Sequence, residues 1–288
     1  MSSQSIALLP IELWDIIIRL SVPPPGLGRD MEYPWIDSSR RRKQDQELRR
    51  EWSLNINRLS AVCRFWRELL STIRNQDLRI TRGGRLRLAL LLEEYNRNPS
   101  LFRETQRIRI HFPIKEGISS LITFVQGIGS LTALELIIDD GVDVSGVYEP
   151  LREHLPEILN ATPSLIRLEI EHPLEFDPTS VLSTDMIGRF SDAGRHLKCL
   201  SCSLGVDPSY ALDVPPSFPH LEILRIAVRC SLRTPVVHEW FKRWELPSLK
   251  QLSLHGYMLR TACETVVALC ADNNIPNLEV FDIRVGRY

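Results

Sequence analysis

One short pattern recurs along the last two thirds of the chain and constrains the fold more than any other feature. Six segments have the form Leu-x-x-apolar-x-apolar, and their leading leucines lie 24 to 34 residues apart. A strand-like unit repeated at this spacing is typical of a solenoid, in which each unit buries its apolar side chains against its neighbours. A weaker seventh copy contains Ile108 and Ile110. The six leading residues are Leu131, Leu165, Leu197, Leu221, Leu249 and Leu278.

The segments between these repeats have a helical pattern of apolar residues. We expect helices over residues 118–125, 149–159, 179–190, 236–244 and 260–270. Because strands and helices alternate, the sequence predicts an α/β fold for residues 76–288.

A doubly wound sheet also alternates strands and helices, but its strands are usually continuous apolar runs because helices cover both faces. Here charged and apolar residues alternate, as in Arg167-Leu168-Glu169-Ile170-Glu171. We therefore favour an open solenoid and expect one face of its sheet to be solvated.

The array resembles a leucine-rich repeat. In the standard repeat an Asn or Cys two residues after the strand bonds to the backbone of the turn, whereas this chain has residues such as Gly205 and Arg229 there. The resemblance therefore implies an irregular, leucine-rich-repeat-like β-α solenoid over residues 76–288.

Side chains along a strand alternate between the two faces of a sheet. The residues between the paired apolar positions should therefore form one row across the sheet, which we call the charged row. Such a row is a candidate surface for a target protein, with the loops as the alternative. The charged row contains Arg109, Glu135, Glu169, Ser201, Arg225, Ser253 and Asp282, and a flanking row contains His111 and His255. The candidate target-binding residues are Arg109, Glu135, Glu169, Arg225, His255 and Asp282.

Two amphipathic helices are predicted near the N-terminus. The first has an apolar stripe with the i, i+3, i+4, i+7 spacing of one helical face. The second follows after residue 58 and has the same period. Both need a surface on which to pack. The stripe of the first helix is Leu13, Ile16, Ile17 and Leu20, and that of the second is Leu59, Val62, Cys63, Trp66, Leu69, Leu70 and Ile73.

These two segments together resemble an F-box. The first contains Leu9-Pro10-x-Glu12-Leu13 with Ile17, and the second contains Val62-Cys63-Arg64-x-Trp66. The Leu-Trp pair after Glu12 and the long middle segment are similar to F-box proteins of mushroom-forming fungi. The resemblance implies an F-box-like helical domain over residues 1–75, with an inserted loop or helix at about 22–56.

The F-box resemblance implies a substrate-recognition subunit of a Skp–cullin–F-box E3 ubiquitin ligase. Such a chain is a non-catalytic adaptor without a cofactor, and its partners are the Skp adaptor, through it a cullin, and an unknown target protein. The alternative is a protein-interaction scaffold of the leucine-rich-repeat type without ligase function. The residues expected to contact the Skp adaptor are Leu9, Pro10, Leu13, Ile17, Val62 and Trp66.

Composition excludes several other classes of protein. The formal net charge is −1, which gives no general attraction to nucleic acid or to acidic membranes. The basic run at residues 40–43 is diluted by nearby acidic residues, and we interpret it as a solvated surface. There is no apolar run of membrane-spanning length and no secretory signal, so we expect a cytoplasmic or nuclear protein that does not enter a membrane.

A catalytic or metal site is not expected. Cys199 and Cys202 are close in sequence, but a separation of three in a strand directs the two side chains to opposite faces. Other zinc ligands at a defined spacing are missing, and there is no phosphate loop or nucleophile elbow. A thiol enzyme remains an alternative only if Cys and His side chains meet in a pocket.

Overall fold

The structure is a computed structural model that describes residues 11–21, 38–80, 84–112, 118–138, 145–171, 182–205, 216–229, 244–256 and 275–285. The chain divides into two compact units. The helical unit comprises Met1–Leu78 and Ser100–Thr105, and the repeat unit comprises Arg79–Pro99 and Gln106–Tyr288. The division falls within a strand, a few residues after the boundary expected at residue 75, and the short segment Ser100–Thr105 belongs to the helical unit.

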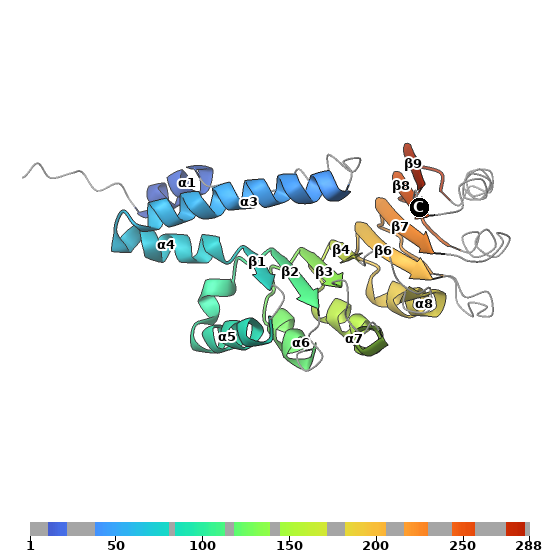
Figure 1. Ribbon diagram of the computed structural model, residues 1–288, viewed down its shortest axis with the longest axis horizontal. Helices are drawn as coiled ribbons and strands as arrows, with labels where there is room; N and C mark the ends of the chain where they lie inside the picture. Colours follow the sequence, from blue (N-terminus) through green and yellow to red (C-terminus); the bar gives the residue numbers. More distant parts are fainter. Residues whose placement is uncertain are drawn as a thin grey trace, which may run out of the picture. The chain divides into compact units, whose positions relative to one another are not determined.

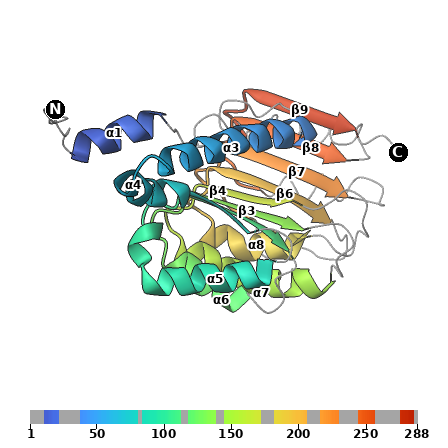
Figure 2. The same cartoon turned by 60° about the vertical axis from the view of Figure 1, so that its left-hand side comes forward.

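The repeat unit alternates strands with helices, and α5 to α8 lie on one face of its sheet (Figures 1 and 2). The predicted α/β fold is therefore confirmed, and the arrangement agrees with a solenoid-like repeat. The helices are α5 (Gly84–Arg97), α6 (Ile118–Gln126), α7 (Ser145–Ala161) and α8 (Thr184–Ala193), preceded by the 3-10 helix η1 (Pro99–Phe102). The strands are β1 (Asp77–Ile80), β2 (Arg107–Phe112), β3 (Ala133–Ile138), β4 (Arg167–Glu171), β5 (Leu182–Ser183), β6 (Cys199–Gly205), β7 (Ile223–Arg229), β8 (Gln251–Gly256) and β9 (Val280–Val285).

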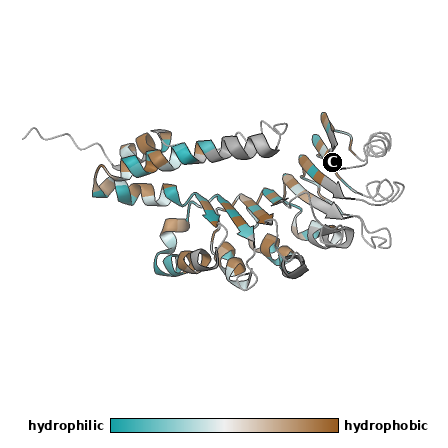
Figure 3. Cartoon of the chain, in the orientation of Figure 1, coloured by the Kyte–Doolittle hydropathy of each residue, from teal (hydrophilic) through white to brown (hydrophobic). Residues whose placement is uncertain are grey.

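The strands follow the order β1-β2-β3-β4-β6-β7-β8-β9, with β5 attached to β6. The pairs from β2 to β9 are parallel. Figure 3 shows apolar and polar residues alternating along these strands. The apolar positions of the repeat stand in register, and those on β3 to β8 are buried. These buried residues are Leu134, Leu136, Leu168, Ile170, Leu200, Cys202, Leu224, Ile226, Leu252 and Leu254.

A repeated backbone connection joins successive repeats just before each strand. The carbonyl of Thr132, for example, accepts the N–H groups of Ile166 at 2.9 Å and Arg167 at 3.0 Å. Each leading leucine also donates its N–H to the carbonyl three residues earlier. These contacts explain why the leucine pattern predicts the strand positions so well. The carbonyls that accept in this double manner belong to Gln106, Thr132, Ile166, Lys198, Glu222 and Lys250.

A polar side chain before the leading leucine replaces the missing asparagine of the standard repeat. Ser164 Oγ donates to the carbonyls of Gly129 at 2.9 Å and Leu131 at 3.0 Å. Ser248 Oγ donates to Pro219 O at 2.6 Å. Asn277 Nδ2 likewise donates to Pro247 O at 2.6 Å. These three contacts form a ladder at the amino ends of β4, β8 and β9, where each bonds its turn to the preceding one.

The helices expected over 118–125 and 149–159 correspond to α6 and α7. The helix expected over 179–190 begins only at Thr184, because Leu182 and Ser183 pair with Leu204 and Gly205 of β6 instead. The helices expected over 236–244 and 260–270 lie outside the described residues, apart from Trp244, which is not helical.

The helical unit contains α1 (Ile11–Ser21), α3 (Ser38–Ser60) and α4 (Arg64–Arg74). The prediction of one continuous second helix from Leu59 is wrong, because the chain turns at Ala61 and Val62 between α3 and α4. Cys63 is the N-cap of α4 in an extended conformation, and its sulfur accepts the Trp66 N–H at 3.5 Å. A polar atom at the N-cap satisfies a donor that the helix cannot satisfy.

The insertion expected at about 22–56, as a loop or helix, is helical from residue 38 onwards. Residues 38–56 form most of α3, which supplies Trp52 and Ile56 to the core of the helical unit. A long helix with two buried side chains is an integral part of that core. Residues 22–37 lie outside the described part of the chain. The core cluster consists of Ile18, Trp52, Ile56, Leu70 and Ile73, with Leu59, Trp66 and Leu69 packed against it.

Candidate functional site

The first candidate surface is the outward face of α1. Leu13, Ile16, Ile17 and Leu20 have exposed fractions of 43%, 51%, 41% and 76%. They are the stripe predicted from the sequence, which we now call the outer stripe. The stripe does not pack within the helical unit as an ordinary amphipathic helix would.

The opposite face of α1 makes the contacts that hold the helix in the unit. Ile18 is buried in the core cluster. The rings of Trp14 and Trp66 lie 5.2 Å apart between centroids, at an interplanar angle of 58°. This contact joins the two halves of the F-box-like motif, which are far apart in sequence. Helix α1 is therefore apolar on both faces, and only one of them is used inside the unit.

An ion pair fixes the C-terminal end of α1. Two guanidinium nitrogens of Arg19 each lie 2.7 Å from a carboxylate oxygen of Glu104. Gln76 Nε2 donates to the same carboxylate at 2.8 Å. The Arg19 hydrogen bonds lower the pKa of Glu104 below its ordinary value, although partial burial opposes them. The segment Ser100–Thr105 thus anchors the helix that displays the outer stripe.

The other residues expected to contact the Skp adaptor have different surroundings. Val62 lies in the turn between α3 and α4 and is 62% exposed. Trp66 is half-buried against the core, so its described contacts are internal. Leu9 and Pro10 lie outside the described residues.

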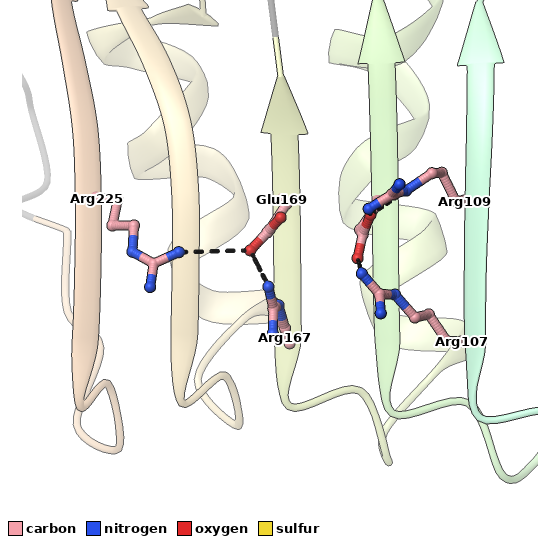
Figure 4. A network of polar contacts seen from close by, with 6 residues as sticks. Arg107, Arg109, Arg167, Glu169 and Arg225 are labelled. Atoms are coloured by element: carbon pink, nitrogen blue, oxygen red, sulfur yellow. Dashed lines mark hydrogen bonds and ion pairs between the residues drawn. The ribbon is translucent and has the colours of Figure 1, made fainter. Parts of the chain in front are cut away.

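The second candidate surface is the charged row of the repeat unit. Its seven members align across the sheet from β2 to β9, as the sequence predicts. Figure 4 shows side chains of this row and its neighbours on the sheet. His255 stands in the flanking row, paired in register with Ala227 and Arg284. Asp282, the β9 member, is partly exposed.

Arginines hold both carboxylates of the charged row. Glu135 forms ion pairs with Arg107 and Arg109. Arg167 Nε donates to Glu169 Oε1 at 3.0 Å, and Arg167 also contacts it through Nη2. Arg225 Nη1 lies farther away, at 3.8 Å from Glu169 Oε1.

The guanidinium groups around Glu169 determine the direction in which its pKa is shifted. Burial by itself would raise the pKa of Glu169. The positive charges of Arg167, Arg225 and Arg107 outweigh that effect and hold the pKa below its ordinary value. Glu169 is therefore ionised at neutral pH, inside the structure.

The expectation that this face of the sheet is solvated is wrong for the centre of the charged row. Glu135 is 1% exposed and Glu169 is 3% exposed. Carboxylates can lose their water because the neighbouring guanidinium groups replace it with charge-assisted hydrogen bonds. Burial removes these two residues from the set that a partner contacts directly.

Two arginines of this network were not among the residues predicted from the row. Arg107 and Arg167 stand two residues before Arg109 and Glu169, so the period of two places them on the same face. Including the preceding position of each strand would have found them.

The surroundings of three cysteines bear on the alternatives of a metal site and a thiol enzyme. Within the described ranges, no group of three or more His, Cys, Asp or Glu side chains is arranged to hold a metal ion. Burial raises the pKa of Cys202 to about 12, which leaves almost no thiolate at neutral pH. Cys63 caps a helix, and Cys199 is buried. None of the helices that can be described is long and apolar enough to cross a membrane.

Comparison with protein-family models finds no match, and comparison with curated proteins finds none. Among solved structures, the chain is similar to a Bacteroides fragilis protein whose crystal structure was determined by the Northeast Structural Genomics Consortium. The two are 14% identical over 70% of this chain, with a TM-score of 0.37. The match spans 60% of the other protein's length. A similarity at this level gives no information about function.

Proposed function

We propose that this chain is the target-recognition subunit of a Skp–cullin–F-box ubiquitin ligase. The helical unit docks on the Skp adaptor protein, and the repeat unit binds the protein to be ubiquitinated. The outer stripe is the observation that supports this proposal best. One face of α1 packs in the core of the helical unit, and the other face exposes four large apolar side chains. An exposed apolar helix face of this kind is a typical docking surface for a partner protein.

The position of the stripe agrees with the resemblance to an F-box. Leu13 and Ile17 are both motif residues and members of the outer stripe. The contact between Trp14 and Trp66 brings the two motif halves into one unit. The long segment between the halves therefore does not prevent them from acting as one domain.

In this proposal the chain performs no bond chemistry. It holds a target protein close to the ubiquitin-transferring partner and so raises the effective concentration of the target's lysines. A cullin joins the assembly through the Skp adaptor. The rigid parallel sheet of the repeat unit suits this role because it presents side chains in fixed rows.

Co-expression with a Skp adaptor tests the docking step. The double substitution Leu13→Ala and Ile17→Ala removes two exposed apolar side chains, and we expect affinity to fall about tenfold for each. Leu90→Ala is the matched control, because Leu90 is 60% exposed on the repeat unit. Circular dichroism verifies that the variants fold. Equal co-elution of the double variant and the control would refute adaptor docking.

The cullin separates the ligase from a scaffold without ligase function. Purification of the wild-type chain from cells should recover a cullin together with the Skp adaptor. Recovery of the adaptor alone would favour the scaffold. The double variant should lose both partners.

A further inference from the structure

Arg225 makes less use of its donors than the other arginines around Glu169. Its Nη1 is 3.8 Å from Glu169 Oε1, beyond hydrogen-bond distance. The same oxygen already accepts hydrogen bonds from Arg167. The Nε of Arg225 is buried and has no hydrogen-bond partner. Glu169 therefore attracts Arg225 but does not satisfy it.

Small polar residues flank Arg225 on both neighbouring strands. Ser201 of β6 and Ser253 of β8 stand beside it in register. Figure 4 shows the Arg225 side chain extending from β7 over β6 towards Glu169. The short side chain of Ser201 leaves room for this course. On β8, Gln251 precedes Ser253 by two residues on the same face, and its buried Oε1 has no partner.

Arg225 is also easier to reach than the arginines next to it in the network. Its side chain is 15% exposed, compared with 7% for Arg167 and 2% for Arg107. A ligand that approaches this face therefore meets Arg225 before Arg167 and Arg107.

These groups match the chemistry of a small anion. A guanidinium offers Nε and Nη donors in a planar fork that fits two oxygens of a phosphate or carboxylate. Ser201 stands on β6, the strand over which the guanidinium extends, so Ser201 is the serine next to the fork, whereas Ser253 lies on the far side of β7. Four arginines surround two carboxylates in this network, so positive charge is in excess beside the fork.

We propose that Arg225 and Ser201 form an anion-binding subsite for a phosphate or carboxylate group of the target protein. Arg225 binds two oxygens of the anion, and the Ser201 hydroxyl donates to one of its oxygens. Glu169 positions the guanidinium from the opposite side. This inference rests on the proposed role of the repeat unit as the target-binding surface.

The test uses the full chain and three immobilised pools of random-sequence peptides. The central residue is phosphoserine in the first pool, glutamate in the second and serine in the third. The wild-type chain should retain at least one anionic pool tenfold better than the serine pool. The better of the two anionic pools identifies phosphate or carboxylate as the ligand. Equal retention of all three pools would overturn the proposal.

Substitutions locate the binding in the subsite. Arg225→Gln should abolish the preference for the anionic pool, whereas Arg195→Gln should keep it, because Arg195 is an exposed arginine paired with Asp192. If Arg225→Gln does not fold, Ser201→Ala replaces it, with an expected loss of at least threefold. Unchanged retention by the folded variant would overturn the subsite.

The same variants distinguish this inference from the proposed function. Arg225→Gln should still bind the Skp adaptor, and the Leu13→Ala and Ile17→Ala double variant should still prefer the anionic pool. If the wild-type chain does not bind the Skp adaptor but prefers the anionic pool, the proposed ligase function is refuted and the proposed subsite stands. Adaptor binding without anion preference would refute the subsite alone.

Discussion

The two units depart from the usual distribution of side chains in opposite directions. The helical unit exposes four large apolar residues on α1, whereas the repeat unit buries two carboxylates with their arginines. The buried charges have partners inside the unit, so they are explained by the unit itself. The exposed apolar side chains gain nothing from the helical unit. The comparison shows how the two cases differ. Buried charges that are paired inside their own unit need no external partner, whereas exposed apolar side chains without such contacts indicate a surface for one.

The largest effect is expected when a buried ion pair of the repeat unit is broken. Glu169→Gln removes the buried charge that faces Arg167, and we expect the free energy of unfolding to fall by about 3–5 kcal/mol. Urea denaturation measures this change. Glu222→Gln is the control, because Glu222 pairs with Lys198 and Lys250 near the surface and should contribute less than about 1 kcal/mol. Equal losses in both variants would mean that burial does not distinguish the two carboxylates.

The same carboxylate should give a pH dependence. The pKa of Glu169 in the folded state lies below its value in the unfolded state. The unfolded value is about 4.3, as for a free glutamate side chain. Its contribution is fully present above the unfolded pKa and is lost as the pH falls through the folded pKa. Stability measured from pH 7 downwards should therefore fall less steeply for Glu169→Gln than for the wild type in the acid range.

The second prediction compares the two faces of α1. Ile18→Ala empties part of the core and should cost about 2–4 kcal/mol of unfolding free energy. Leu20→Ala, two residues away on the exposed face, should change stability by less than about 0.5 kcal/mol. In an adaptor-binding assay with folded variants the ranking should reverse. Leu20→Ala should weaken the complex more than Ile18→Ala does. A large stability loss for Leu20→Ala would show that the outer stripe has an internal role.

The third prediction concerns the half-exposed ion pair of the helical unit. A double-mutant cycle with Arg19→Ala and Glu104→Ala should give a coupling of about 1 kcal/mol or less, since solvent screens the pair. The side chains are 38% and 35% exposed, in contrast to the buried pairs of the repeat unit. A coupling as large as the effect of Glu169→Gln would contradict this ranking.

The smallest expected effect is in the side-chain ladder between repeats. Ser248→Ala removes one hydrogen bond to Pro219 O and should lower the unfolding free energy by about 0.5–1 kcal/mol. Thermal unfolding of the variant beside Ser71→Ala, whose hydroxyl bonds within its own helix, measures the difference. No difference between the two would mean that the ladder does not stabilise the contact between repeats.

Much of the repeat unit could be predicted because its information is local and repeated. The leading leucines mark each turn, and the period of two then places Glu135, Glu169 and Arg225 in one row. The break between α3 and α4 could not be predicted from periodicity, because Leu59 and Trp66 keep a helical spacing across it. The Cys63 N-cap decides the break, and a cysteine is not among the usual capping residues.

The burial of the charged row was also beyond local patterns. A glutamate in an alternating strand normally indicates a wet face. Only the structure shows that Arg107, on the strand next to Glu135, and Arg167, on the same strand as Glu169, neutralise the two charges. Those neighbours are 26 or more residues away in most cases, or hidden two positions earlier on the same strand.

By itself, the sequence determined the alternation of strand and helix, the register of the repeats and the helical nature of the N-terminal segments. Each of these follows from the spacing of apolar residues along a few turns or one strand. Only the tertiary structure decided which apolar face of α1 enters the core, because both faces have similar hydrophobicity. It also decided that Trp14 meets Trp66 and that four arginines gather around two carboxylates. Such contacts join residues distant in the chain, and packing and charge neutralisation select them only when the whole unit folds.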